Sequence, residues 1–171
     1  MIVSAIPFIG NKRKLWKQIE PLLPKGDVFL DLFAGGGTVS LNATKKYNQV
    51  LGTELMWQIA ELHNSFKNDK RFLDKLIRVN KAYPSTKEGY YKLRGDYNIE
   101  PSPVKLLNLI LRSNTNMVRF NLSGGFNVPY GERNHFNLDR LQTHIDSCGN
   151  TDTIEGSYEV LLDMLPVFDG Q

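Results

Sequence analysis

One stretch of this chain constrains its fold more than any other. The apolar run Val28-Phe29-Leu30 leads into Asp31 and then into three consecutive glycines at 35–37, with residues of helical character from Thr38 onward. A buried strand that ends on an acidic residue and turns through glycines into a helix lets a ligand approach the backbone N–H groups, because glycine has no side chain to block it. The pattern therefore predicts a loop for a nucleotide-like ligand.

The surrounding elements alternate between strand and helix. Apolar spacing predicts a first helix over 12–23, strands over 27–32 and 50–54, and a helix over 36–47. The next helix runs from Ile59 to Phe66, and its apolar face includes His63. Repetition of this unit favours a parallel sheet with right-handed crossovers, so we expect an α/β fold with a partial Rossmann-like sheet.

After residue 68 the pattern changes. Three helices are predicted in succession over 72–79, 90–97 and 104–113, followed by a glycine-rich hairpin over 121–131. A helix over 136–145, a third core strand over 153–159 and an apolar segment over 158–168 come last. We therefore divide the chain into a core part at 1–68, a helical insertion at 69–135 and a return to the core at 136–171.

Composition limits the class of protein. Hydrophobic residues make up 41% and charged residues 23%, as in soluble globular domains. No apolar run is long enough to cross a bilayer and no secretory leader is recognisable, so we predict a cytoplasmic protein. The single cysteine, Cys148, excludes an internal disulfide, and the three scattered histidines predict no metal site.

The net charge of +3 is too small to indicate a nucleic-acid partner by itself. Its distribution is uneven, with one cluster near the N-terminus and a set of arginines spread through the second half: Lys12, Arg13, Lys14 and Lys17, then Arg112, Arg119, Arg133 and Arg140. Charge alone favours solvated faces over a binding site.

Two acidic residues stand where ligand hydroxyls could be held. Asp31 ends the first predicted strand, and Glu54 ends the second one 23 residues later, near the spacing at which an acidic residue meets ribose hydroxyls. The glycine loop lacks both the Gly-x-Gly-x-x-Gly and the Gly-Lys-Ser/Thr patterns, so neither hydride transfer nor nucleotide hydrolysis is favoured. Packing alone remains the alternative explanation for the glycines.

The segments 7–15 (PFIGNKRKL) and 31–37 (DLFAGGG) together resemble the opening of the DNA adenine-N6 methyltransferases of the Dam type. In that family the two segments embrace S-adenosylmethionine, and an acidic residue closing the next strand holds its ribose. The resemblance therefore implies S-adenosylmethionine as cofactor. The cofactor-binding residues that it implies are Phe8, Gly10, Lys12, Asp31, Phe33, Ala34, Gly35, Gly36 and Glu54.

The segments 90–98, 112–121 and 125–131 are similar to the DNA-recognition region of the same family, where a helical bundle and a hairpin contact GATC-like sites. The resemblance implies double-stranded DNA as partner, with recognition located in the insertion. Arginine pairs with guanine edges or phosphates, and asparagine can bond adenine. The predicted contacts are Arg94, Arg112, Asn116, Arg119, Asn121 and Arg133, while Thr115 replaces an aromatic residue that wedges into the duplex in some relatives.

Complete enzymes of the family carry an Asp-Pro-Pro-Tyr motif that holds the flipped adenine, and these 171 residues contain none. We therefore expect no catalytic residue in this chain. Catalysis would require a second chain that carries the missing half, or a self-associated dimer. Otherwise the chain is a truncated product. The alternative is a non-catalytic DNA-binding or cofactor-binding remnant that competes with an active methyltransferase. A small-molecule methyltransferase is disfavoured by the recognition-like segments over 90–131.

Overall fold

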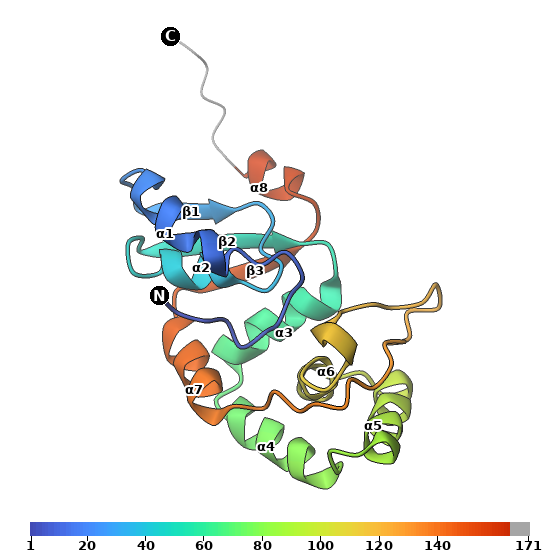
Figure 1. Ribbon diagram of the computed structural model, residues 1–171. Coiled ribbons are helices and arrows are strands. Elements are labelled where there is room, and N and C mark those ends of the chain that lie inside the picture. The colour runs from blue at the N-terminus through green and yellow to red at the C-terminus, as the bar shows by residue number, and fades with distance from the viewer. Residues whose placement is uncertain (165–171) are drawn as a thin grey trace.

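The computed structural model describes residues 1–164 and shows a three-stranded parallel sheet with helices packed around it (Figure 1). The strand order is β1 (Val28–Asp31), β2 (Gln49–Glu54) and β3 (Thr151–Glu155). The register pairs Asp31 with Gly52 and Glu54 with Glu155. This arrangement confirms the predicted α/β class and brings the carboxyl ends of β1 and β2 together at one edge of the sheet.

The described helices are η1 (Arg13–Leu15), α1 (Trp16–Ile19), η2 (Glu20–Leu22), α2 (Thr38–Ala43), α3 (Trp57–Asn68), α4 (Phe72–Ala82), α5 (Lys87–Ile99), α6 (Pro103–Ile110), η3 (Asn114–Asn116), α7 (Leu138–Ser147) and α8 (Glu159–Asp163). The single helix predicted over 12–23 is instead three short pieces, because Pro21 has no N–H to continue an α-helical ladder. α2 begins two residues later than predicted, since Gly37 adopts φ +73°, and it ends at Ala43, before the predicted end at 47.

Helix α3 joins the sheet to the other helices. It packs against β2 and β3 on one side and against α6 and α7 on the other, while α2 covers β1 and β2. The helix buries Ile59, Leu62 and Phe66 along one face, as the sequence predicts. One apolar cluster runs from Ile2 through α3, α4, α5 and α6 to α7, so the helices of the predicted insertion share a core with the elements beside the sheet.

The predicted hairpin over 121–131 is not formed as two strands. It contains a turn in which the Asn121 N–H donates to the Gly125 carbonyl at 2.9 Å, and a single antiparallel bridge joins Phe120 to Phe126. A second bridge pairs Ser113 with Tyr130. Pro129 offers no N–H, so a regular ladder cannot continue through this segment.

The third core strand begins two residues earlier than predicted and ends at Glu155, after which α8 packs against β2. The part of the predicted apolar segment beyond Met164 lies outside the described residues. Within residues 1–164, no helix is long and apolar enough to cross a membrane.

Candidate functional site

The glycine loop between β1 and α2 is a tight, internally bonded turn. The Ala34 N–H donates to the Thr53 carbonyl at 3.0 Å, and the Gly37 N–H donates to the Ala34 carbonyl at 2.7 Å. Gly35 and Gly37 both adopt positive φ, +49° and +73°, a backbone region that residues other than glycine enter only at an energetic cost. The loop is therefore held against the end of β2 in a conformation that its glycines permit.

The N-terminal segment packs directly on this loop. A Cβ atom added to Gly36 would lie 2.7 Å from the Phe8 Cβ and 2.8 Å from the Ile6 carbonyl oxygen. The Ser4 hydroxyl donates to the Gly36 carbonyl, which fixes the two segments to each other. The absence of side chains at 36 serves this close packing as well as any approach of a ligand.

His63 of α3 supports the loop from below. Its Nε2 lies 2.7 Å from the Gly35 carbonyl oxygen, and a Cβ on Gly37 would lie 2.5 Å from its Cε1. Burial lowers the pKa of His63, and its hydrogen bond to Gly35 only partly opposes this. The imidazole is therefore neutral at pH 7, with the Nε2–H donating to the loop.

A second buried histidine, His144 of α7, holds the N-terminal segment. Its Nδ1 accepts from the Ala5 N–H at 3.0 Å, and its ring stacks on Phe66 with 4.0 Å between centroids. Burial lowers the pKa of His144 well below its ordinary value, and the nearby His63 and Arg140 lower it further. A neutral ring is also what the hydrogen bond requires, because a protonated Nδ1 could not accept.

Asp31 faces the loop itself. Its Oδ2 accepts from the Ser40 hydroxyl at 2.6 Å, and its Oδ1 accepts from the Phe33 N–H at 3.4 Å. The carboxylate thus ties the end of β1 to α2, and it lines neither of the cavities described next. In this structure Asp31 organises the loop from within.

Two cavities adjoin the glycine loop and share Phe8, Phe33 and Gly35 in their walls. One, of about 360 Å³, extends to Glu54 and Tyr158, and the other, of about 330 Å³, extends to Gly10 and Lys12. Their walls include eight of the nine predicted cofactor residues: Phe8, Gly10, Lys12, Phe33, Ala34, Gly35, Gly36 and Glu54. The structure therefore brings together residues from three separate segments, while their binding role stays a prediction.

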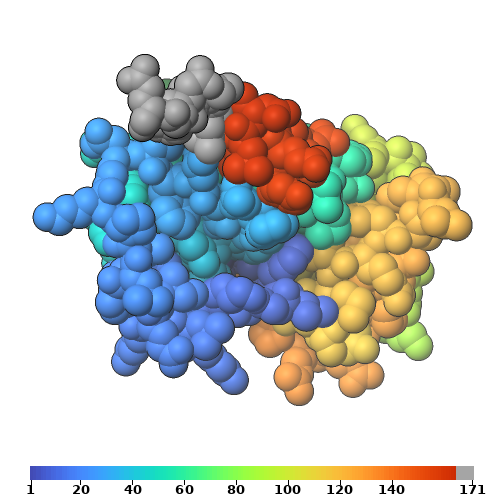
Figure 2. Space-filling model, turned by 90° about the horizontal axis from the view of Figure 1, so that it is seen from above, coloured from blue at the N-terminus to red at the C-terminus, as the bar shows by residue number. Residues whose placement is uncertain are grey.

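The first cavity has an aromatic rim. The Phe33 side chain is 78% exposed, and its ring lies 5.7 Å from that of Tyr158, at the start of α8. Figure 2 shows α8, in red, beside the blue and cyan surface of the β1 region. Glu54 lies in the same wall, and one of its carboxylate oxygens, Oε1, accepts from the Met56 N–H at 3.0 Å. The cavity thus combines exposed aromatic surface with one carboxylate.

Arg112 is placed differently from the prediction. The residue is fully buried, and its guanidinium donates to the Tyr83 carbonyl at 2.7 Å and to the carbonyl and Oδ1 of Asn80 at 2.9 and 2.6 Å. Its side chain therefore joins α6 to the end of α4 and cannot reach a duplex. The structure corrects the prediction, and we remove Arg112 from the DNA contacts.

The other predicted DNA contacts lie in the exposed turns or beside them. Arg119 and Arg133 are exposed, and Arg119 Nε donates to Asn127 Oδ1 at 2.7 Å across the turn. Asn121 is exposed too, but its Oδ1 accepts from the Gly125 N–H at 2.7 Å and so shapes the turn. Arg94 lies 4.5 Å from the centre of the Tyr91 ring and is half-buried.

Asn116 lies in the strained turn that follows α6. Its φ is +53° and that of Thr115 is +56°, and the Asn116 Nδ2 donates to the Ile110 carbonyl at 2.9 Å. Asn116 and Arg133 also line one cavity of about 230 Å³. Two predicted contacts from separate segments thus face a common space.

The residues that hold the glycine loop and the N-terminal segment in place could not be identified from the sequence. The apolar period placed His63 on the buried face of its helix but carried no sign of its contact with Gly35. Ser4 and His144 had no recognisable motif, and Arg140 was visible only as one of the dispersed arginines. Their roles depend on pairings between distant segments, which local patterns do not record.

A glycine loop and an acidic strand end at the carboxyl edge of a parallel sheet are the arrangement at which α/β proteins bind nucleotide-type ligands. Residues 8–167 match the model of the D12 class N6 adenine-specific DNA methyltransferase family. The chain belongs to this family, which confirms the resemblance read from segments 7–15 and 31–37.

Individual relatives are similar over most of the chain. The type II methyltransferase M.FokI of Planomicrobium okeanokoites is 32% identical over 142 residues, which is 79% of this chain and 22% of that protein. The modification methylase StsI of Streptococcus sanguinis is 28% identical over 165 residues, or 92% of this chain and 25% of the relative. The DNA adenine methylase of Salmonella typhi is 28% identical over 134 residues, 74% and 46% of the two chains. The chain therefore spans less than half the length of these relatives.

Proposed function

We propose that this chain forms the S-adenosylmethionine-binding and DNA-contacting part of a site-specific DNA adenine-N6 methyltransferase. The single observation that carries the proposal is the convergence of eight predicted cofactor residues on two adjoining cavities at the ends of β1 and β2. When bound, the cofactor supplies an electrophilic methyl group on its sulfonium. The family supplies the methyl donor and the target base, adenine.

The residues present fit such a cofactor. Glu54 presents a carboxylate at the end of β2, and a carboxylate accepts hydrogen bonds from both hydroxyls of a ribose. Phe33 and Tyr158 provide apolar surface of the kind on which a purine ring packs. The remaining cavity, beside Gly10 and Lys12, leaves room for the amino-acid portion of the cofactor.

For DNA we propose a GATC-like site contacted by the exposed turns after α6. Arg119 and Arg133 are solvent-accessible donors, and Asn116 lies next to Arg133 in a shared cavity. Arg94 would act near them, whereas Asn121 would act chiefly by shaping the turn. The likeness to relatives named DNA adenine methylase supports adenine in DNA as the target. The GATC-like sequence rests on the resemblance of segments 90–98, 112–121 and 125–131.

Methyl transfer needs a group that orients the adenine amine, which in the family is the Asp-Pro-Pro-Tyr motif that these 171 residues do not contain. We propose that the chain acts together with polypeptide that carries this motif, either of the same protein or of a second chain. The alternative is a non-catalytic protein that occupies cofactor or DNA sites. A tritium-transfer assay on a GATC duplex separates the two when it is run with and without a family fragment that carries the motif but transfers no methyl group by itself.

The cofactor proposal is tested by isothermal titration of the chain with S-adenosylmethionine. Glu54→Gln is expected to weaken binding about tenfold or more, as loss of a charged hydrogen-bond acceptor does. Glu155→Gln is the matched control, because Glu155 is the register partner of Glu54 on β3, is exposed and lines neither cavity. Equal binding by both variants and the wild type would exclude Glu54 from the site. No binding by the wild-type chain would refute the cofactor proposal for these residues.

A further inference from the structure

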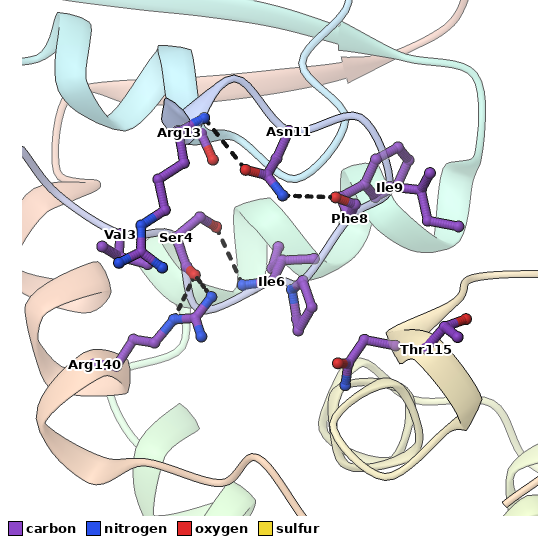
Figure 3. Close-up of a pocket in the computed structure, with 12 residues that line it drawn as sticks. Val3, Ser4, Ile6, Phe8, Ile9, Asn11, Arg13, Thr115 and Arg140 are labelled. Carbon is purple, nitrogen blue, oxygen red and sulfur yellow. Dashed lines mark hydrogen bonds between the residues drawn. The ribbon is translucent and has the colours of Figure 1, made fainter. Parts of the chain in front are cut away.

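A third cavity, of about 210 Å³, lies beside the cofactor cavities and differs from them in being lined by two arginines. Its walls come from the N-terminal segment, from Arg13, from Thr115 and Asn116 in η3, and from Arg140 of α7 (Figure 3). It shares Phe8, Asn11 and Thr38 with the cofactor cavity beside Gly10 and Lys12, whereas Gly35 and Gly36 line only the cofactor cavities. The third cavity therefore lies between the glycine loop and the predicted recognition turns.

Two arginines face this cavity without an acidic partner. In Figure 3 the guanidinium groups of Arg13 and Arg140 approach the same region near Ser4 from different elements. Among residues 1–164 no carboxylate forms an ion pair with either of them. Burial, and next the charge of Arg13, lower the pKa of Arg140, so the cost of keeping two cations here is real.

Arg140 is held in place by the protein. Its Nε donates to the Ser4 carbonyl at 2.7 Å and its Nη2 donates to the same oxygen, whereas its Nη1 bonds to no other group among residues 1–164. Arg13 is exposed, and within residues 1–164 its guanidinium makes no hydrogen bond, whereas its backbone N–H donates to Asn11 Oδ1 at 3.2 Å. One guanidinium is thus preorganised with a free edge, and the other can close from the solvent side.

We propose that this cavity binds one phosphate group of the DNA backbone between Arg13 and Arg140; this inference rests on the proposed function. Guanidinium groups match phosphate oxygens in charge and in their forked geometry. The neighbouring Thr115 and Asn116 line the same cavity, and they belong to the turn that leads to the exposed Arg119.

An anionic group at this place could also be the carboxylate of the cofactor. Two observations favour the phosphodiester. The glycines that define the cofactor cavities do not line this one, and the exposed Arg13 opens it toward the side from which a duplex would arrive. Backbone phosphate contacts set the register of a protein on DNA without reading its sequence.

The position of the phosphate would be transmitted to the cofactor loop. Arg140 holds Ser4 through its carbonyl, and the Ser4 hydroxyl donates to the Gly36 carbonyl. Only Ser4 therefore stands between a DNA strand bound at Arg140 and the glycine loop. The contact would fix the distance between the DNA backbone and the cofactor site.

The test compares Arg13→Gln with Arg78→Gln in the full 171-residue chain, using a GATC duplex at several salt concentrations and S-adenosylmethionine in parallel. Arg78 is an exposed arginine of α4, which lies far from η1 in Figure 1, so it is the matched control. Arg13→Gln is expected to weaken duplex binding about fivefold and to reduce the slope of log affinity against log salt by about one. Cofactor affinity stays unchanged in both variants.

Arg140→Lys keeps a cation that can reach Ser4 but loses the fork, and it is expected to weaken duplex binding without lowering the melting temperature appreciably. If Arg13→Gln weakens binding of the cofactor and not of the duplex, the anion is the cofactor carboxylate and the proposal is overturned. If the wild type binds the duplex and Arg13→Gln behaves like Arg78→Gln, the phosphate site alone is overturned. A wild-type chain that binds no duplex refutes the proposed DNA contact itself, before any variant is compared.

Discussion

Replacing Gly37 by alanine tests how tightly the glycine loop is packed. Two costs follow from the structure. Gly37 adopts φ +73°, which costs an alanine about 1–2 kcal/mol. Its new Cβ would also lie 2.5 Å from Cε1 of the buried His63, and overpacking of this kind costs about 1–3 kcal/mol. We therefore expect Gly37→Ala to lower the free energy of unfolding by about 3 kcal/mol, or the melting temperature by roughly 6–12 °C.

The two costs can be separated experimentally. Gly124→Ala is the control for backbone strain alone, because Gly124 adopts φ +80° and has no atom within 4 Å of an added Cβ. Urea unfolding followed by circular dichroism should show a loss of only about 1–2 kcal/mol for this variant. In a His63→Ala background, Gly37→Ala should cost no more than Gly124→Ala does. Equal losses for Gly37→Ala and Gly124→Ala in the wild-type background would refute the packing of His63 against the loop.

Three further predictions concern residues away from the cavities. Arg112→Ala should lower the free energy of unfolding by about 3 kcal/mol in urea titrations, because it empties the space of a fully buried side chain and removes the donor to the carbonyls of Asn80 and Tyr83; a loss under 1 kcal/mol would contradict the buried position. The free energy of unfolding should fall as pH drops from about 6.5 toward 5, because His144 takes up a proton in the unfolded chain but stays neutral when it is buried in the folded one. A urea midpoint that is unchanged between pH 7.5 and 5.5 would argue against the hydrogen bond from the Ala5 N–H to His144. Gly95→Ala adds a Cβ that meets open space on α5, so it should raise the free energy of unfolding by about 0.5–1 kcal/mol. Calorimetry should show a higher melting temperature, and a lower one would mean that the helix is crowded there.

The sequence predicted the elements that depend on local patterns. The run 28–30, the glycines at 35–37 and the acidic end at Glu54 were enough to place β1, the loop and β2, because strands, turns and caps are encoded by neighbouring residues. β3 was placed two residues late, since its residues 151–155 (TDTIE) are mostly polar and only Ile154 marks it as a strand. The hairpin was expected from glycines that in fact form a turn with a single bridge.

The candidate site was predicted less evenly. Residues in contiguous motifs, such as Phe8 and Gly36, were predicted from the sequence because the segments that contain them resemble those of a known family. Arg112 was misplaced because an arginine after an apolar helix can turn inward when carbonyl oxygens are available, and the partners at 80 and 83 are distant in sequence. Arg140 was not recognised as part of a site, because its role depends on Ser4, 136 residues away.

A crystal structure of the chain with S-adenosylhomocysteine would test most directly whether the ends of β1 and β2 form one cofactor site. We predict the ribose hydroxyls within hydrogen-bond distance of the Glu54 carboxylate and the ligand against Gly35 and Phe33. A ligand bound elsewhere, for example in the cavity of about 410 Å³ between the start of α4 and the end of α7, would contradict the account.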